Sequence, residues 1–175
     1  MGMIGMEGRI LRSERLYCRL LEESDKPALY ALLSDETVTL PAGFRALQSE
    51  EEADSFFRTL TRYRTGVALT ADGTLIGYLH VTRMLSDHPA YSGKLCISIG
   101  IVIGKDHQRR GYGSEALSLF TSYLKERFDF CFTEHFLENE ASRKTILRCG
   151  YRYLETCRLF LDALDCEKDC LRYVL

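Results

Sequence analysis

The stretch "KDHQRRGYGSEAL", residues 105–117, decides the fold, because it joins a β-rich run to a helical pattern through a basic loop. The apolar run "KLCISIGIVIG", residues 94–104, leads directly into it, as expected of a central strand with both faces covered. From Ser114 onward, apolar residues recur at helical spacing. A strand, a loop of consecutive N–H groups and a helix N-terminus form a concave anion site. The residues also leave open an ordinary solvated turn.

The loop itself has the chemistry of a phosphate site. Gly111 and Gly113 remove Cβ atoms where phosphate oxygens would lie, and Arg109 and Arg110 add cationic donors at the rim. No Gly-Lys-Ser/Thr follows, and the spacing G-x-G-x-x-G is absent, so the loop is neither a Walker loop nor a dinucleotide fingerprint.

Length and charge narrow the class of protein. The chain has 175 residues, and we expect one domain over residues 1–175, with residues 1–9 as a flexible N-terminal lead. The formal net charge of -2 argues against a nucleic-acid partner, so any anion site must be local. No run approaches the roughly 18 apolar residues of a membrane span, and no secretory signal is present. These features predict a cytoplasmic protein with no membrane partner.

The cysteines and histidines predict neither disulfides nor a metal site. The seven cysteines are scattered through apolar strings, which suits reduced thiols in the core. There is no C-x-x-C, and the four histidines lie far apart in the sequence, so we expect no metal ion.

The remaining patterns predict strands that surround paired helices. Together they indicate an α/β (α+β) fold with a single sheet covered on both faces. The predicted elements are an opening strand (15–21), helices after Ser24 or Asp25 and after Ser49, a hairpin turning at Asp72-Gly73, a strand (129–136), a helix capped by Asn139 and ended by Gly150, and a terminal hairpin turning around residues 165–168.

Two linked motifs resemble the GNAT family of N-acetyltransferases. The string "QRRGYG" resembles the family's Q/R-x-x-G-x-G/A signature, which holds the pyrophosphate of acetyl-coenzyme A. The segment "NEASRKTILRCGY", residues 139–151, resembles the later N-x-x-S/A motif that ends in Gly-Phe/Tyr. The strings "EESDKPALYALLSDETVT" and "ADGTLIGYLHV" are similar to the branch that modifies protein N-termini, ribosomal proteins and small amines. The resemblance covers roughly residues 10–175.

This resemblance implies a mixed, mostly antiparallel twisted sheet flanked by helices, the acyl-CoA N-acyltransferase-like fold. It implies direct transfer of an acetyl group from acetyl-coenzyme A to a primary amine, on a protein N-terminus or a small molecule, by a monomer or homodimer. The alternative is a coenzyme A-binding regulatory module with reduced catalysis. The cofactor-binding residues implied are Ile101, Val102, Ile103, Gln108, Arg109, Arg110, Gly111, Tyr112, Gly113, Ser114 and Asn139.

The proton-transfer residues depart from the family pattern. Many relatives carry a Glu where this chain has Ser98, and a Ser hydroxyl is too weak a base to accept an ammonium proton, although it can orient a water. Glu134 is the best carboxylate candidate, and an exposed or ion-paired carboxylate is the alternative. His135 should point to the opposite face of a regular strand.

The acid that protonates the leaving thiolate is also altered. Many relatives place a Tyr where this chain has Ile146, and the resemblance transfers the role to Ser142. The alternatives are a helix cap for Asn139 and an ordinary first-turn residue for Ser142. Acceptor choice should depend on the loops "LPAGFRALQ" and "SDHPAYSG", whose candidate residues are Phe44, Arg45, His88 and Tyr91.

Overall fold

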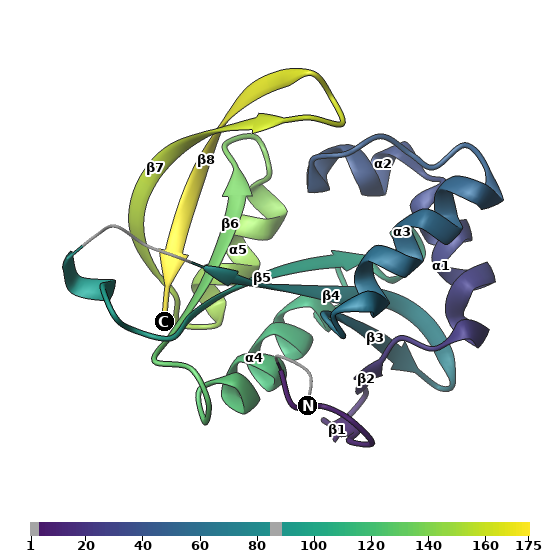
Figure 1. Ribbon diagram of the computed structural model, residues 1–175, viewed down its shortest axis with the longest axis horizontal. Helices are drawn as coiled ribbons and strands as arrows, with labels where there is room; N and C mark the ends of the chain where they lie inside the picture. The colour runs from purple at the N-terminus through teal and green to yellow at the C-terminus, as the bar shows by residue number, and fades with distance from the viewer. Residues whose placement is uncertain (1–3, 85–88) are drawn as a thin grey trace.

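The computed structural model of the protein describes residues 4–84 and 89–175. Its strands form one eight-stranded sheet in the order β1-β2-β3-β4-β5-β6-β8-β7 (Figure 1). Every neighbouring pair is antiparallel except β5 and β6, which are parallel. The predicted mixed, mostly antiparallel sheet is therefore confirmed.

The elements follow the predicted order along the chain. The strands are β1 (Leu11–Arg12), β2 (Tyr17–Leu20), β3 (Gly66–Ala71), β4 (Thr74–Met84), β5 (Cys96–Ile103), β6 (Phe130–Phe136), β7 (Arg152–Leu161) and β8 (Cys166–Val174). The α-helices are α1 (Lys26–Leu33), α2 (Glu36–Thr39), α3 (Glu50–Arg62), α4 (Tyr112–Leu124) and α5 (Glu140–Arg148). Short 3-10 turns are η1 (Glu23–Asp25), η2 (Leu40–Ala42), η3 (Pro89–Tyr91) and η4 (Lys105–His107).

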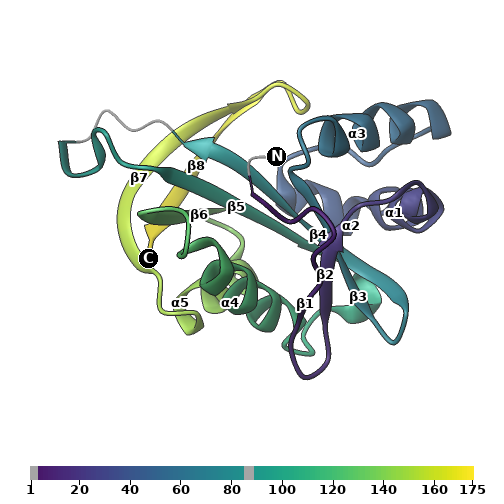
Figure 2. The ribbon, with the colours of Figure 1, turned by 60° about the horizontal axis from the view of Figure 1, so that its bottom comes forward.

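Helices cover both faces of the sheet. Figure 2 shows α1 and α3 on one side of the central strands and α4 and α5 on the other. Because side chains alternate along a strand, β5 contributes to both layers: Ile97 and Ile99 pack in the cluster that contains α4, and Val102 packs with α1 and α3. This explains why β5 reads as almost continuously apolar.

Local signals set several boundaries as predicted. Ser49 caps α3, its Oγ accepting a hydrogen bond from the Glu52 N–H at 3.2 Å. The hairpin between β3 and β4 turns at Asp72 and Gly73, whose φ angles are 50° and 76°. Two positive φ angles in succession are what a tight turn of this kind requires, and Gly73 adopts its own without strain.

Three parts of the chain differ from the sequence expectations. The two-residue strand β1 was not predicted, because two residues carry too little pattern to identify. The terminal hairpin turns before Cys166, so residues 166–168, expected in the turn, belong to β8. The described part of the expected flexible lead is packed instead: Ile4 and Met6 lie in the core, and the Tyr123 hydroxyl donates to the carbonyls of Ile4 and Gly5 at 3.0 and 2.7 Å.

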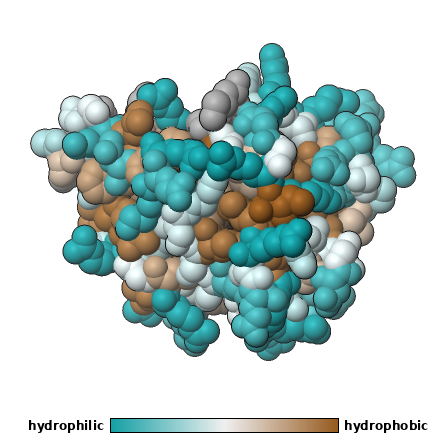
Figure 3. Space-filling view, turned by 90° about the horizontal axis from the view of Figure 1, so that it is seen from below, coloured by the Kyte–Doolittle hydropathy of each residue, from teal (hydrophilic) through white to brown (hydrophobic). Residues whose placement is uncertain are grey.

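The outer surface is mixed in character. Figure 3 shows the molecule from below, where polar side chains interrupt the apolar areas. No helix among the described residues is long and apolar enough to cross a membrane. All seven cysteines are free; Cys18, Cys96, Cys131 and Cys170 are buried and the other three are half-buried.

Candidate active site

The two central parallel strands separate after three paired positions. The register between β5 and β6 runs from Cys96 opposite Phe130 to Ser98 opposite Phe132, and then the strands diverge (Figure 1). At the point of divergence the Thr133 hydroxyl donates to the Ile99 carbonyl at 2.9 Å. Beyond that bond, the β6-facing edge of β5 has no strand partner among the described residues.

This edge exposes main-chain groups from alternate residues of β5. The Gly104 N–H donates to Ile76 on β4 at 2.8 Å, so by alternation Val102 also faces β4, whereas Ile101 and Ile103 face the divergence. The Ile103 carbonyl accepts from the Gln108 side-chain amide at 2.9 Å. Of the three strand residues predicted to bind cofactor through their amides, Val102 is therefore directed away, since its N–H pairs with β4.

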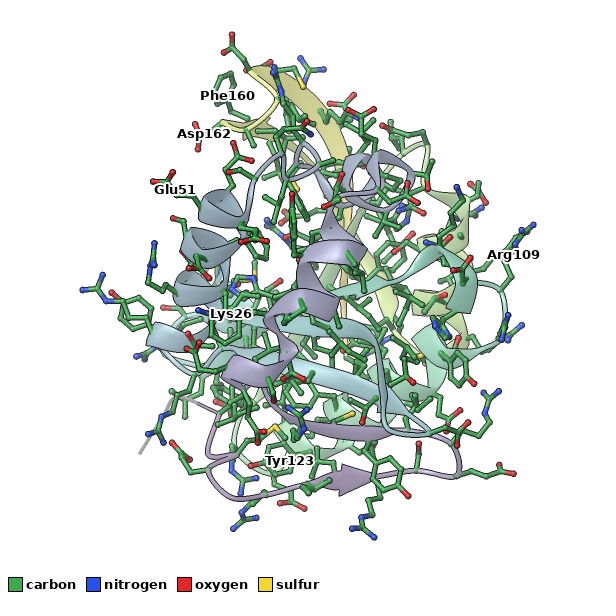
Figure 4. All side chains as sticks on the ribbon, turned by 90° about the vertical axis from the view of Figure 1, so that its right-hand side faces the viewer. Lys26, Glu51, Arg109, Tyr123, Phe160 and Asp162 are labelled. Atoms are coloured by element: carbon green, nitrogen blue, oxygen red, sulfur yellow. The ribbon has the colours of Figure 1, made fainter. Side chains whose placement is uncertain are left out.

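The basic loop, residues 108–113, continues from this edge into α4. Arg109 and Gly111 adopt left-handed conformations with φ of 59° and 85°, and Gly111 caps α4 with no side chain. In the part of the chain that the structure describes, the N–H groups of residues 109–114 find no hydrogen-bond acceptor. Arg109 and Arg110 are exposed, and Figure 4 shows Arg109 extending away from the body of the molecule. These N–H groups are thus available to a ligand.

A salt bridge that the sequence did not reveal holds this loop in place. Arg15 donates through Nη1 to the Arg110 carbonyl at 3.0 Å and through Nε and Nη2 to Glu115 at 2.8 and 2.6 Å. Its guanidinium also lies 4.7 Å from the centroid of the Tyr112 ring. Partial burial works to raise the pKa of Glu115, but hydrogen bonds from Ser13 and Arg15 outweigh it and lower that pKa.

The second motif lies beside the first. A Cβ built on Gly113 would lie 3.6 Å from Thr145 Cγ2, and the Cys149 thiol donates to the Ser114 carbonyl at 3.3 Å. Asn139 caps α5, because its Oδ1 accepts from the Ser142 N–H at 3.0 Å. The predicted cap is confirmed; it uses the main chain of Ser142, and the Asn139 Nδ2 also donates to the Pro41 carbonyl at 3.3 Å. The Ser142 hydroxyl is half-buried and has no hydrogen-bond partner among the described residues.

The carboxylate candidate Glu134 is ion-paired. Its Oε1 accepts from Arg172 Nε at 2.6 Å, and Arg172 Nη1 donates to Glu155 at 2.5 Å. This was the alternative left open by the sequence. As predicted, His135 points to the opposite face, where it is buried and bonds the Tyr173 hydroxyl at 3.2 Å.

Ser98 lies on the face opposite α4, the same face as Glu134. It pairs with Thr82 on β4 and Phe132 on β6. Two residues further along β5, Gly100 pairs with His80. His80 is half-buried, and burial lowers its pKa from 6.5. The sequence reasoning missed His80, although its register with Gly100 follows once the hairpin and β5 are assigned.

The residues proposed to select the acceptor are not gathered in one place. Phe44 stacks on Phe56 with ring centroids 5.5 Å apart, and Tyr91 packs edge-on against Phe130 and Phe132 at 4.8 and 5.1 Å. Tyr91 is a core residue rather than an accessible contact. Arg45 is exposed, and His88 lies outside the described residues. Ile146, at the family's Tyr position, is buried and supplies no acid.

The hydrogen-bond donors around the β5 edge and the basic loop suit an organic anion better than a metal ion. Among the residues that the structure describes, no group of three His, Cys, Asp or Glu side chains is placed to hold a metal ion. The available donors are main-chain N–H groups, two arginines and hydroxyls, which match phosphates and a thioester carbonyl.

Solved structures share this fold. A GNAT-family acetyltransferase from Bacillus anthracis superimposes with a TM-score of 0.78 at 21% identity, covering 95% of this chain and 97% of that one. The structure of RimL, a ribosomal alpha-N-protein acetyltransferase in complex with coenzyme A, gives a TM-score of 0.75 at 19% identity, covering 95% and 97%. These likenesses confirm the acyl-CoA N-acyltransferase-like fold.

Sequence comparison extends the relationship from fold to family. The chain is 28% identical over 156 residues to the uncharacterized N-acetyltransferase YoaA of Bacillus subtilis, covering 82% of each chain. The profile of the acetyltransferase (GNAT) domain matches residues 15–152, which include the basic loop, the α5 motif and Arg15. The chain therefore belongs to the GNAT family of acetyl-CoA-dependent N-acetyltransferases.

Proposed function

We propose that acetyl-coenzyme A binds along the edge of β5 and the start of α4, and that the acetyl group passes to an amine from the face of Ser98. The observation that carries this proposal is a row of main-chain donors in two parts. The first part is the N–H groups of Ile101 and Ile103, and the second is the N–H groups of residues 109–114; between them, the N–H groups of Gly104, His107 and Gln108 are bonded within the protein. A diphosphate accepts hydrogen bonds from such a loop, and the dipole of α4 favours its charge.

Each part of the donor row has a separate task. The N–H groups of residues 109–114 bind the pyrophosphate, with Arg109 and Arg110 at its rim. The amides of Ile101 and Ile103 bind the arm and carbonyl, and an N–H aimed at the thioester oxygen stabilises the negative charge that develops during attack. The Gln108 side chain contributes indirectly, because its bond to Ile103 fixes the loop to the strand.

The leaving thiolate needs a proton, and in this proposal Ser142 supplies it. Its hydroxyl is uncommitted, its helix begins at the cap Asn139, and α5 packs beside the start of α4. Asn139 contacts the cofactor arm from the same turn in this proposal. Ser98 and the ion-paired Glu134 lie on the acceptor side, where Ser98 orients a water.

The acceptor is a primary amine on a protein N-terminus or a small molecule. Support comes from fold relatives: RimL is an alpha-N-acetyltransferase of a ribosomal protein, and a Vibrio cholerae relative bears the name of a ribosomal-protein-serine acetyltransferase. We place the reaction in the cytoplasm, in a monomer or homodimer.

Thiol release tests the proposal. Acetyl-coenzyme A is incubated with the protein and a panel of free-amine peptides and small amines, and free thiol is measured. We expect release that depends on both protein and acceptor. Binding of coenzyme A without acceptor-dependent release across the panel would support the regulatory module instead. No binding of coenzyme A contradicts both.

A further inference from the structure

We propose that His80 is the general base that takes the proton from the acceptor amine, an inference that rests on the function proposed above. The family pattern does not assign a general base in this chain. Ser98 stands where many relatives carry a carboxylate, and the Glu134 carboxylate is ion-paired with Arg172. The observation behind this proposal is that His80 pairs with Gly100, which lies just beyond the last paired position of β5 and β6. The His80 imidazole has no hydrogen-bond partner among the described residues.

The register puts His80 on the acceptor face. Directly paired residues of an antiparallel ladder project their side chains to the same side. His80 pairs with Gly100, and Ser98, two residues from Gly100, projects to that side as well. Glu134 follows Phe132, the parallel partner of Ser98, by two residues and shares the face. The three polar side chains therefore share one face of the sheet, with His80 and Ser98 on the adjacent strands β4 and β5 and Glu134 on β6, across the divergence.

Gly100 leaves space between His80 and the divergence. It is exposed, and a Cβ built on it would meet only the His80 carbonyl oxygen, at 3.8 Å. Its φ is not positive, so the backbone does not demand glycine there. The missing side chain leaves room on β5 for an amine or a water between the imidazole and the Ile101 amide.

The imidazole is in the state that a base needs. It makes no hydrogen bond among the described residues, and burial holds its pKa below 6.5, so it is neutral at pH 7. Titratable or charged groups on this face include Tyr78 on its own strand and Arg19, which is paired with Asp25. They also include a cluster in which Arg172 is paired with both Glu134 and Glu155, and the thiols of Cys157 and Cys170. The α3 side chains packed on the sheet here, Phe57 and Leu60, are apolar.

The other histidines do not fit the role. His135 is hydrogen-bonded on the opposite face, His107 lies in η4 before the basic loop, and His88 is outside the described residues.

The proton balance of the step is complete. The acceptor ammonium gives one proton to a ring nitrogen of His80, directly or through one water, and the neutral amine attacks the thioester carbon. The C–N bond forms, the C–S bond breaks, and the second amine proton reaches the departing thiolate through Ser142. The His80 proton then passes to solvent, so the products are the amide, coenzyme A thiol and one proton.

This base matches one class of amine better than another. An α-amino group has a pKa of about 8, and a lysine side chain has one of about 10.4. An imidazole, with an ordinary pKa of about 6.5, is closer in pKa to an α-amine than to a lysine side chain, so it takes a proton from the α-amine at a smaller free-energy cost. We therefore infer α-amines, on peptide N-termini or amino-acid derivatives, rather than lysine side chains.

The test compares His80→Gln with wild type on two nucleophiles. A short peptide with a free α-amine needs deprotonation at pH 7, whereas hydroxylamine is largely neutral there and does not. We expect His80→Gln to lower kcat for the peptide by about 100-fold and to lower the hydroxylamine reaction by less than about threefold. The dissociation constant for coenzyme A should not change. Arg83→Gln, an exposed change on the opposite face of β4, serves as the control.

The pH profile supplies a second readout. In wild type, kcat/KM for the peptide should fall on acidification through the pKa of His80, below 6.5, and His80→Gln should lack that limb. Equal losses on both nucleophiles would overturn the proposal, as would an unchanged peptide rate. A preference of wild type for the lysine side chain of an N-terminally blocked peptide would overturn the amine class. If wild type binds no coenzyme A, the proposed function itself has failed.

Discussion

Arg15 donates a hydrogen bond to the main-chain carbonyl of Arg110 at 3.0 Å, joining residues 95 positions apart in the sequence. In a planar trans peptide the carbonyl and the following N–H point in opposite directions. By holding the Arg110 carbonyl, Arg15 therefore turns the Gly111 N–H away from itself, toward the side where the pyrophosphate is proposed to bind. Glu115 keeps the guanidinium oriented through two further bonds.

Arg15→Gln should weaken coenzyme A binding by about tenfold or more, because a charge-assisted hydrogen bond contributes about 1.5–3 kcal/mol. Titration calorimetry with coenzyme A and with pantetheine measures the effect. Pantetheine lacks the pyrophosphate, so its affinity should not change. Arg12→Gln, on the same segment and exposed, is the control. Equal losses for both ligands would show that Arg15 acts on the fold and not on the loop.

Gly111→Ala and Gly113→Ala should change stability in opposite directions. Gly111 has a φ of 85°, where a Cβ costs about 1–2 kcal/mol. Gly113 lies within α4 at negative φ, and its added Cβ would make an ordinary 3.6 Å contact with Thr145. There alanine should stabilise the protein by up to about 1 kcal/mol. Urea unfolding measures both, and two changes of the same sign would contradict the assigned backbone conformation.

Ser142→Ala should separate chemistry from capping. The cap uses the Ser142 N–H, so the free energy of unfolding should change by less than about 0.5 kcal/mol. The lost proton donor should lower kcat by about 100-fold. Asn139→Ala removes the cap and should cost about 1 kcal/mol. Steady-state kinetics and urea unfolding of the two variants check this; an unchanged kcat in Ser142→Ala would remove Ser142 from the mechanism.

His80 should also affect stability as the pH falls. Its folded pKa lies below 6.5, so between that pKa and about 6.5 the unfolded chain binds more protons and stability declines on acidification. Above about 6.5 both states are neutral and the contribution vanishes. Unfolding of wild type and His80→Gln at pH 5 to 7.5 tests the sign: their stability difference should shift in favour of His80→Gln as pH falls. A constant difference would mean that the imidazole is as solvated folded as unfolded.

Much of the fold was predictable because its signals are local. Ser49 and Asn139 identify their helices by capping, and Asp72-Gly73 identifies its hairpin by backbone conformation. The basic loop was recognised from its glycines and its place between a strand and a helix. Each of these signals depends on a few neighbouring residues.

The site features that were missed depend on relationships between distant segments. Arg15 meets Arg110 only because β1 and the turn that follows it lie near α4, and no sequence pattern in either segment predicts that contact. The register of β4 on β5 directs the Val102 N–H away from the proposed cofactor site and places His80 opposite Gly100. A shift of one residue in that register would move every side chain to the other face of the sheet. The ion pair between Glu134 and Arg172 needed the pairing of β6 with β8.

A crystal structure of the protein with coenzyme A tests the central claim most directly. The account predicts the pyrophosphate within hydrogen-bond distance of the N–H groups of residues 109–114, with the pantetheine arm bonded to the main chain of Ile101 and Ile103 and the sulfur near Ser142. Coenzyme A bound elsewhere, with these N–H groups still facing solvent, would contradict the assignment of the site.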